Sequence, residues 1–307
     1  MSLVHRHAIA LMDTVVTFEV VVRAPHGADA ARVAAGVERA IEWFRRVERA
    51  CSRFDPSSEV RALARQPGVA VRVSPLLFET VQFALAVAEA SGGAFDPAVG
   101  ADLEARGFDR EYRSGDRQTS GIRPDPTASY RDLTLDPERR TIALGRPVLL
   151  DLGGVAKGLA VDLAARELAP FEHFAIDAGG DLFLAGRNAD DEPWAIGIEH
   201  PRDRTRRIET LRVSNAAVCT SGDYARRTSH GHHLLDPRTR RPADRVASAT
   251  VMAPTAMVAD AFATAAFVLG PDDGVRFLER QNVDGWLVTP ALERFATGSR
   301  AEILSHA

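Results

Sequence analysis

The chain of 307 residues contains little cysteine, few aromatic side chains and no long apolar run. Cys51 and Cys219 lie far apart and form no CxxC motif, so no disulfide framework is indicated. A membrane-spanning helix needs roughly 18–20 apolar residues and a secretory signal roughly 7–15, whereas the apolar patch near the N-terminus covers only Ala8–Met12. There is also no early cysteine that could carry a lipid. These absences predict a cytoplasmic protein without a membrane anchor.

Charge of one sign is not in excess either. Lys and Arg total 38 against 42 for Asp and Glu, which gives a net charge of -4. A nucleic-acid-binding protein usually has a basic surface, so nucleic acid is not an expected partner. Apolar residues make up 45% and charged residues 26% of the chain, as in ordinary globular proteins. The sequence can therefore form a sizeable buried core.

Strand-like and helix-like segments are mixed along the chain without a regular alternation. We expect strands at Thr14–Val22, Thr141–Leu144, Val148–Leu150, Phe174–Asp177, Leu182–Leu184, Trp194–Glu199 and Ser248–Met252, and helices over Ala28–Arg49, from Ser74–Pro75 to Gly92–Gly93, over Val155–Leu168 and over Met257–Leu269. This order predicts an α+β fold, with a mixed or antiparallel sheet flanked by helices, in one domain over residues 1–307. Residues 101–140 are charged and irregular, and we interpret them as a surface excursion.

Two glycine pairs mark places where the backbone could approach a ligand. DLGGVAKG, at Asp151–Gly158, runs from an expected strand into an expected helix. The free N–H groups at such a helix start favour phosphate, and Lys157 adds a positive charge. The simpler interpretation is a strand-to-helix turn with a surface lysine. IDAGGD, at Ile176–Asp181, is by itself more typical of a hairpin.

The segment Thr220–Pro242 contains three histidines, at positions 230, 232 and 233. No HExxH or CxxC motif accompanies them, so zinc is not favoured. For His230 and His232 we expect exposed loop positions. His233 directly precedes Leu234 and Leu235, and an apolar pocket edge there could hold it as a base, since histidine titrates near neutral pH.

The helix VADAFATAAFVLG places Asp260 and Thr264 four residues apart, and therefore on the same side. Its surroundings are nearly all apolar, and a buried carboxylate needs a partner. A hard cation such as Mg²⁺, held by carboxylate, hydroxyl and backbone oxygens, would meet that need. The alternative is an acid near the helix start, with Thr264 bonded back to the helix. Together the motifs indicate phosphoryl chemistry on a nucleotide, without saying which nucleotide.

These segments, in their order and spacing, resemble the ApbE family of FAD:protein FMN transferases. The resemblance is carried by MDT at Met12–Thr14, SRFDPSSEV at Ser52–Val60, GGAFDPAVG at Gly92–Gly100, DLGGVAKGLAVD at Asp151–Asp162, DAGGD at Asp177–Asp181, TSGDY at Thr220–Tyr224, HLLDPRT at His233–Thr239 and VADAFAT at Val258–Thr264. It implies an ApbE-like fold and an enzyme that binds FAD with Mg²⁺ and cleaves the diphosphate. Such enzymes join FMN to a Thr or Ser hydroxyl of an acceptor protein and release AMP.

The resemblance also assigns roles to residues of this chain. It implies that His233 activates the acceptor hydroxyl. It implies an FAD site lined by Met12, Phe54, Ala94, Phe95, Asp96, Asp151, Lys157 and Leu234, and a Mg²⁺ site formed by Asp260, Thr264 and the carbonyl of Gly154.

Three departures and two alternatives qualify these expectations. Members of the family are commonly exported lipoproteins, but this chain has no evident export signal, which favours a cytoplasmic flavoprotein as acceptor. MDT at Met12–Thr14 replaces the MGT that is common in the family, so Asp13 takes the place of a glycine. Residues 101–140 match no recognised motif. The same site residues would serve a Mg²⁺-dependent FAD pyrophosphatase, which uses water instead of the acceptor. A flavin-binding protein without activity is the second alternative, and it has no need of a base beside the phosphates.

Overall fold

The computed structural model describes residues 2–23 and 30–298. The α-helices are α1 (Ala30–Cys51), α2 (Glu59–Ala64), α3 (Pro75–Ala90), α4 (Gly100–Ala105), α5 (Gly153–Leu168), α6 (Ala256–Leu269) and α7 (Pro271–Arg280), and the short 3₁₀ turns are η1 (Pro97–Val99), η2 (Tyr130–Asp132) and η3 (Ala169–Phe171). The strands are β1 (Ser2–Leu11), β2 (Thr14–Arg23), β3 (Ala70–Arg72), β4 (Leu133–Asp136), β5 (Thr141–Leu144), β6 (Phe174–Ala178), β7 (Asp181–Ala185), β8 (Trp194–His200), β9 (Asp203–Val213), β10 (Ala216–Gly222), β11 (Arg227–Thr228), β12 (Gly231–His232), β13 (Leu235–Asp236), β14 (Arg241–Pro242), β15 (Ser248–Ala253), β16 (Asp284–Val288) and β17 (Arg294–Ala296).

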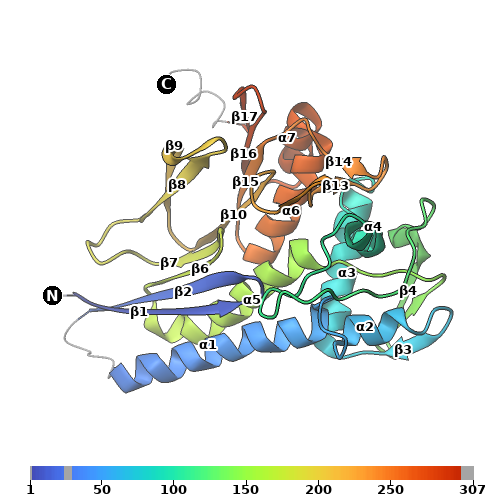
Figure 1. The fold of residues 1–307 in the computed structure, drawn as a ribbon. Helices are drawn as coiled ribbons and strands as arrows, with labels where there is room; N and C mark the ends of the chain where they lie inside the picture. The colour runs from blue at the N-terminus through green and yellow to red at the C-terminus, as the bar shows by residue number, and fades with distance from the viewer. Residues whose placement is uncertain (1, 24–29, 299–307) are drawn as a thin grey trace.

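The central element is an eight-stranded sheet in the order β1-β2-β6-β7-β10-β15-β16-β17. Every neighbouring pair in it is antiparallel. The sheet joins strands from both ends of the sequence. Helix α1 runs along β1 and β2, while α6 and α7 lie by β15 and β16, towards the other edge of the sheet (Figure 1). The expected α+β class with an antiparallel sheet is therefore confirmed.

Each face of the sheet packs against a different layer. On one face, side chains such as Val20, Cys219 and Leu287 join the main core with the helices. On the opposite face, the next residues along the strands, such as Val21 and Val218, pack against the β8–β9 hairpin. This division follows from the alternation of side chains along a strand. The helix-covered face contains α5 and α6, which carry the motifs of interest.

The two tightest turns of the sheet use residues with positive φ. Met12 and Asp13 form the two-residue turn between β1 and β2, at φ of 51° and 62°. Gly179 and Gly180 form the turn between β6 and β7, at 66° and 97°. Such turns match the twist of a hairpin. Thr14 lies so close to Gly179 that a Cβ there would be 2.0 Å from its hydroxyl oxygen. The hairpin interpretation of DAGGD is therefore correct, and this turn packs against the turn that contains MDT.

Helices α5 and α6 cross at very short range. A Cβ on Gly158 would lie 2.4 Å from the carbonyl oxygen of Ala256, so only glycine fits there. The Asp162 carboxylate, one turn further along α5, accepts hydrogen bonds from the N–H groups of Ala256 and Met257 at 2.7 and 2.9 Å. Thr255 caps the same helix end. These contacts fix the position of α6 relative to α5.

Several local expectations were wrong or incomplete. The residues at Val148–Leu150 are buried but form no strand, because they run beside η1 and α4 and bond there, for example through Leu149 to Gly100. The expected helix at Ala28–Arg49 begins at Ala30 in the described part of the chain, and residues 28 and 29 lie outside that part. The elements that were not expected are the strands β1, β3, β4, β9, β10, β11, β12, β13, β14, β16 and β17 and the helices α2, α4 and α7. The segment 101–140 contains α4, η2 and β4, with irregular backbone between them.

Candidate active site

The loop before α5 is held by a buried ion pair. Nε of Arg53 lies 2.5 Å from Oδ2 of Asp151, and the same guanidinium lies over the ring of Phe54 at 4.1 Å. The other carboxylate oxygen of Asp151 accepts the N–H of Gly153 at the start of α5. Burial by itself would raise the pKa of Asp151, but Arg53 and this N–H hold it below its usual value. Asp151 is therefore ionised, and it orients Arg53 beside Phe54.

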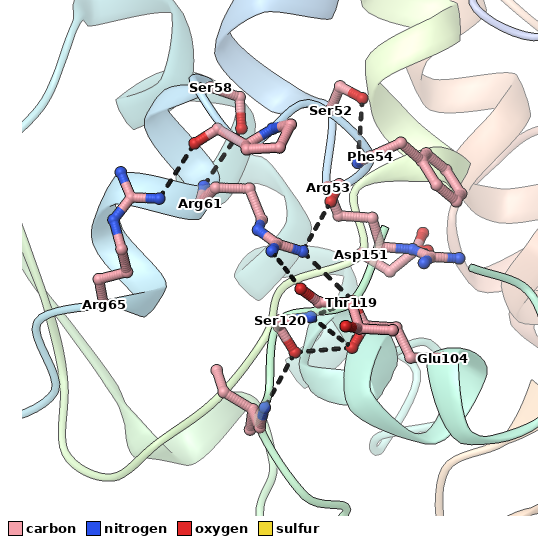
Figure 2. A network of polar contacts seen from close by, with 12 residues as sticks. Ser52, Arg53, Phe54, Ser58, Arg61, Arg65, Glu104, Thr119, Ser120 and Asp151 are labelled. Carbon is pink, nitrogen blue, oxygen red and sulfur yellow. Dashed lines mark hydrogen bonds and ion pairs between the residues drawn. The ribbon is translucent and has the colours of Figure 1, made fainter. Parts of the chain in front are cut away.

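A second buried arginine supports this arrangement from behind. Arg61 donates to the backbone carbonyls of Arg53 and Thr119, at 3.1 and 2.7 Å. It also pairs with Glu104 of α4, which in turn accepts two hydrogen bonds from Ser120. Figure 2 shows this network joining the Phe54 loop to the segment after α4. Part of the irregular stretch 101–140 thus supports the loop that carries Phe54.

Lys157, Asp181 and Asp260 form a buried charged cluster between α5, β7 and α6. Lys157 pairs with Asp181, and Oδ2 of Asp260 accepts the N–H of Gly158 at 3.4 Å. Burial would lower the pKa of Lys157, but the two carboxylates reverse this and raise it. Burial raises the pKa of Asp260 well above its usual value, and Asp181 adds to the rise. The cluster therefore contains two carboxylates and one cation.

Thr264 lies one turn beyond Asp260 on α6, and its hydroxyl is 3.0 Å from that of Ser221 on β10. A Cβ on Gly154 would lie 3.1 Å from both the Thr264 hydroxyl and the ring of Phe95. The first turn of α5 thus packs directly against Thr264. Asp260 lies inside α6, which is capped by another residue, so it is not a capping acid.

The GGAFDP turn is buried and is stabilised by its own acid. Ala94, Phe95 and Asp96 are 1%, 5% and 8% exposed. The Asp96 carboxylate accepts the N–H of Ala98 at 2.8 Å and that of Tyr130 at 3.0 Å. Burial raises its pKa while these bonds oppose the rise. Asp96 therefore fixes the turn, which presents Phe95 to Gly154.

The turn between β1 and β2 is joined to two other parts of the chain. The N–H of Met12 donates to Glu48 of α1 at 3.3 Å. Oδ2 of Asp13 lies 3.1 Å from Nη2 of Arg226. Aspartate tolerates the left-handed backbone region better than most residues, so it can occupy this position of the turn. Its carboxylate pairs with an arginine of the segment after β10.

His233 lies between β12 and β13 and contacts the ring of Phe108 edge-on, with centroids 6.2 Å apart. Its buried Nδ1 has no hydrogen-bond partner within the described residues. Burial, together with the charge of Arg226, lowers its pKa to about 4. His230 is exposed, as expected, but His232 is buried and packs edge-on against Phe267, so the expectation of an exposed loop position was wrong there.

The predicted residues fall into connected groups. Lys157 and Asp260 meet in the buried cluster, Gly154, Phe95 and Thr264 are in contact, and Asp151 lies beside Phe54 through Arg53. Arg53, Asp181, Ser221 and Arg226 were not predicted as site residues, although Arg53, Asp181 and Ser221 lie within the motifs quoted above. Leu234 follows His233 in the chain and is buried. Among residues 2–23 and 30–298, no three His, Cys, Asp or Glu side chains form a metal-binding group.

Comparison with solved structures places this fold among known ones. The structure matches the ApbE protein of Thermotoga maritima with a TM-score of 0.84 and 29% identity, covering 99% of this chain and 100% of that one. It matches the flavin transferase ApbE of Vibrio cholerae with a TM-score of 0.81 and 26% identity, covering 98% and 99%.

Sequence comparison agrees. A protein of Treponema pallidum named FAD:protein FMN transferase is 32% identical over 295 residues, which span 85% of this chain and 79% of that protein. One of Haemophilus influenzae with the same name is 29% identical over 266 residues, 81% of this chain and 74% of that protein. The sequence profile of the ApbE family matches residues 12–287. The chain belongs to the ApbE family. No helix in the described part is long and apolar enough to cross a membrane.

Proposed function

We propose that this chain is an FAD:protein FMN transferase that uses Mg²⁺ and modifies a Thr or Ser hydroxyl of an acceptor protein. The hydroxyl oxygen attacks the phosphorus that carries riboflavin, and a new phosphoester bond forms. The bond from this phosphorus to the bridging oxygen of the diphosphate breaks, and its electron pair leaves with AMP. The proton of the hydroxyl passes to a ring nitrogen of His233. The relatives that bear this enzyme name support the proposal.

The observation that carries the proposal is the buried cluster of Asp260, Asp181 and Lys157. Asp181 and Asp260 are only 2% and 6% exposed, yet they share a single lysine among the described residues in contact with them. A buried carboxylate without compensation is costly, which is the reason for the raised pKa of Asp260. The cluster is therefore suited to receive additional positive charge.

The residues around this cluster fit Mg²⁺. The carboxylate of Asp260, the hydroxyl of Thr264 and the carbonyl of Gly154 are hard oxygen donors, and Thr264 lies against Gly154. Such a set contains only one carboxylate and takes its other two oxygens from a hydroxyl and the backbone, so it needs no cluster of three His, Cys, Asp or Glu side chains. When bound, Mg²⁺ supplies positive charge that offsets the charge of the diphosphate.

His233 is suited to take up the proton. Its pKa of about 4 keeps the imidazole neutral, and able to accept a proton, across neutral pH. The negative diphosphate of a bound nucleotide favours the protonated ring and shifts this pKa upward, towards the range in which a general base works best. Phe108 packs against the ring and limits its movement.

The test is a flavinylation assay with the protein, FAD, Mg²⁺ and candidate acceptors that carry a Thr or Ser site. Transfer gives a protein band whose flavin fluorescence survives a denaturing gel, together with one AMP per flavin attached. Chelation of Mg²⁺ with EDTA is expected to stop the reaction. Asp260→Asn is expected to lower the rate at least about 100-fold, because it removes a charged ligand.

Asp190→Asn is the matched control, since Asp190 is exposed in the loop between β7 and β8 and should leave the rate unchanged. Release of free FMN and AMP without a labelled protein band would indicate an FAD pyrophosphatase instead of a transferase. FAD binding without any AMP would indicate a flavin-binding protein. An Asp260→Asn variant with the wild-type rate would refute the proposed metal site.

A further inference from the structure

Arg226 lies two residues after the TSGDY motif, in the segment that joins β10 to β11. Its Nη2 is 3.1 Å from Oδ2 of Asp13, and the two side chains are 41% and 44% exposed. The backbone of Arg226 also lies against the ring of His233 and influences its pKa. This residue therefore joins the turn that contains Met12 to the proposed base.

The charge of Arg226 acts on four of the site residues. Burial is the larger influence on the pKa of each, but the guanidinium also favours the ionised forms of Asp151 and Asp260 and disfavours the protonated forms of Lys157 and His233. The four belong to the loop before α5, to α5, to α6 and to the segment between β12 and β13. Interactions between charges weaken with distance and screening, so these four effects are consistent with a guanidinium on the side of the site where Asp13 holds it.

Arg226 differs from the other cations of the site in its partner. Lys157 and Arg53 each pair with a carboxylate inside the protein. Arg226 pairs with Asp13, which solvent reaches on the turn between β1 and β2. Exposed ion pairs contribute little to stability, so this pair opens easily. The charge of Arg226 is therefore available to a stronger anion.

We infer that Arg226 binds the diphosphate of the flavin nucleotide by exchanging the carboxylate of Asp13 for a phosphate oxygen. The inference rests on the proposed function, because FAD supplies the diphosphate. A guanidinium offers parallel N–H donors that match phosphate, and charge-assisted hydrogen bonds of this kind are strong. Arg226 then distinguishes flavin nucleotides from riboflavin, which has no phosphate and gains nothing from this contact.

Calorimetric titration of the full chain with FAD and with riboflavin, without acceptor protein, tests the assignment. Arg226→Ala is expected to weaken FAD binding by about tenfold or more, which corresponds to one charge-assisted hydrogen bond. Riboflavin binding should stay within about twofold, because the contact involves only phosphate. Arg226→Lys should recover part of the FAD affinity, since it keeps the charge but not the planar fork.

Two further variants sharpen the comparison. Arg227→Ala is the matched control, because this neighbouring arginine is exposed and donates to the backbone carbonyl of Asp223. It should bind both flavins as the wild type does. Asp13→Asn removes the competing carboxylate, so FAD affinity should be equal or higher. A loss in Asp13→Asn as large as that in Arg226→Ala would overturn the exchange of partners.

Equal losses of FAD and riboflavin affinity in Arg226→Ala, or no loss at all, would overturn the assignment. If Arg226→Ala does not fold, as judged by its thermal midpoint, Arg226→Gln and Arg226→Lys carry the same comparison. A wild-type protein that binds FAD but transfers no FMN refutes the proposed function and leaves the role of Arg226 intact. A transferring enzyme whose Arg226→Ala variant binds FAD normally refutes the role of Arg226 alone.

Discussion

The imidazole of His233 links the site to the pH dependence of stability. Burial lowers its pKa to about 4 from 6.5. Between these values the unfolded chain binds more protons at this position than the folded one, so the free energy of unfolding rises with pH. The contribution is complete above pH 6.5 and is lost as pH falls to about 4, and it amounts to about 3 kcal/mol.

We therefore expect His233→Gln, which cannot be protonated, to lose this dependence. Urea unfolding of both proteins at several values between pH 4 and pH 7 measures it: the difference in unfolding free energy should change with pH by about 3 kcal/mol in total. Parallel curves would show that His233 is not buried as a neutral ring. The variant should still bind FAD but lose flavinylation, and transfer at the wild-type rate would place the base elsewhere.

The site shows which residues a sequence can reveal. Asp260 and Thr264 stood out because a carboxylate in an apolar helix requires an explanation. Asp181 was recognised only as part of a hairpin motif, since its pairing with Lys157 depends on how β7 packs against α5. Arg226 carried no signal at all, because arginines are common in loops. The assignment of Met12, Phe54 and Leu234 to the FAD site rests on the family resemblance, because apolar side chains give no signal of their own for a flavin.

At the scale of elements, the crossing of α5 and α6 depends on Gly158. Alanine normally favours a helix over glycine by about 1 kcal/mol, but a Cβ here would lie 2.4 Å from a backbone oxygen of Ala256. Gly158→Ala should therefore lower the free energy of unfolding by about 1–3 kcal/mol, the range for an overpacked core. It should also reduce activity, since the two helices carry Lys157 and Asp260. Denaturant unfolding measures the first effect and the flavinylation assay the second.

Gly36→Ala in α1 is the matched control. The added Cβ would lie 2.8 Å from a ring atom of Phe171, and that ring is a side chain that can move. The free energy of unfolding should then change by less than about 1 kcal/mol, because the helical gain and the shift of the ring offset each other. If Gly158→Ala and Gly36→Ala lower the free energy of unfolding equally, the α5–α6 crossing does not depend on glycine more than α1 does.

The elements that the sequence revealed have strong internal patterns, and those it hid do not. Helix α6 is apolar and capped, and β2 is a run of β-branched residues, so both were expected. Val148–Leu150 has the same composition as a strand, yet no neighbouring strand pairs with it. Strand β1 contains two histidines and an arginine and is largely exposed, which gives no apolar alternation to detect. Pairing with other parts of the chain therefore determines whether each segment is a strand: β1 pairs with β2, whereas Val148–Leu150 bonds to α4 instead.

At the scale of the molecule, the α+β class followed from the mixture of elements, but the order of the strands did not. The sheet places β2 beside β6, and β7 beside β10, so partners in the sheet are far apart in sequence. Nothing in a single sequence specifies such pairings. As a result of these pairings, the main core contains side chains from both ends of the sequence, from Leu11 to Leu287.

We therefore predict that the whole chain unfolds in one cooperative transition. Differential scanning calorimetry should give one peak, with calorimetric and van't Hoff enthalpies that agree, although chains of this size often unfold in steps. FAD with Mg²⁺ should move the entire peak to higher temperature, because a ligand that binds only the folded state stabilises all of it. Two peaks, of which only one responds to FAD, would divide the chain into separate units. The segment 101–140 would then be the first candidate for the unit that does not respond, since side-chain and backbone contacts such as those of Glu104, Phe108 and Tyr130 attach it to the site.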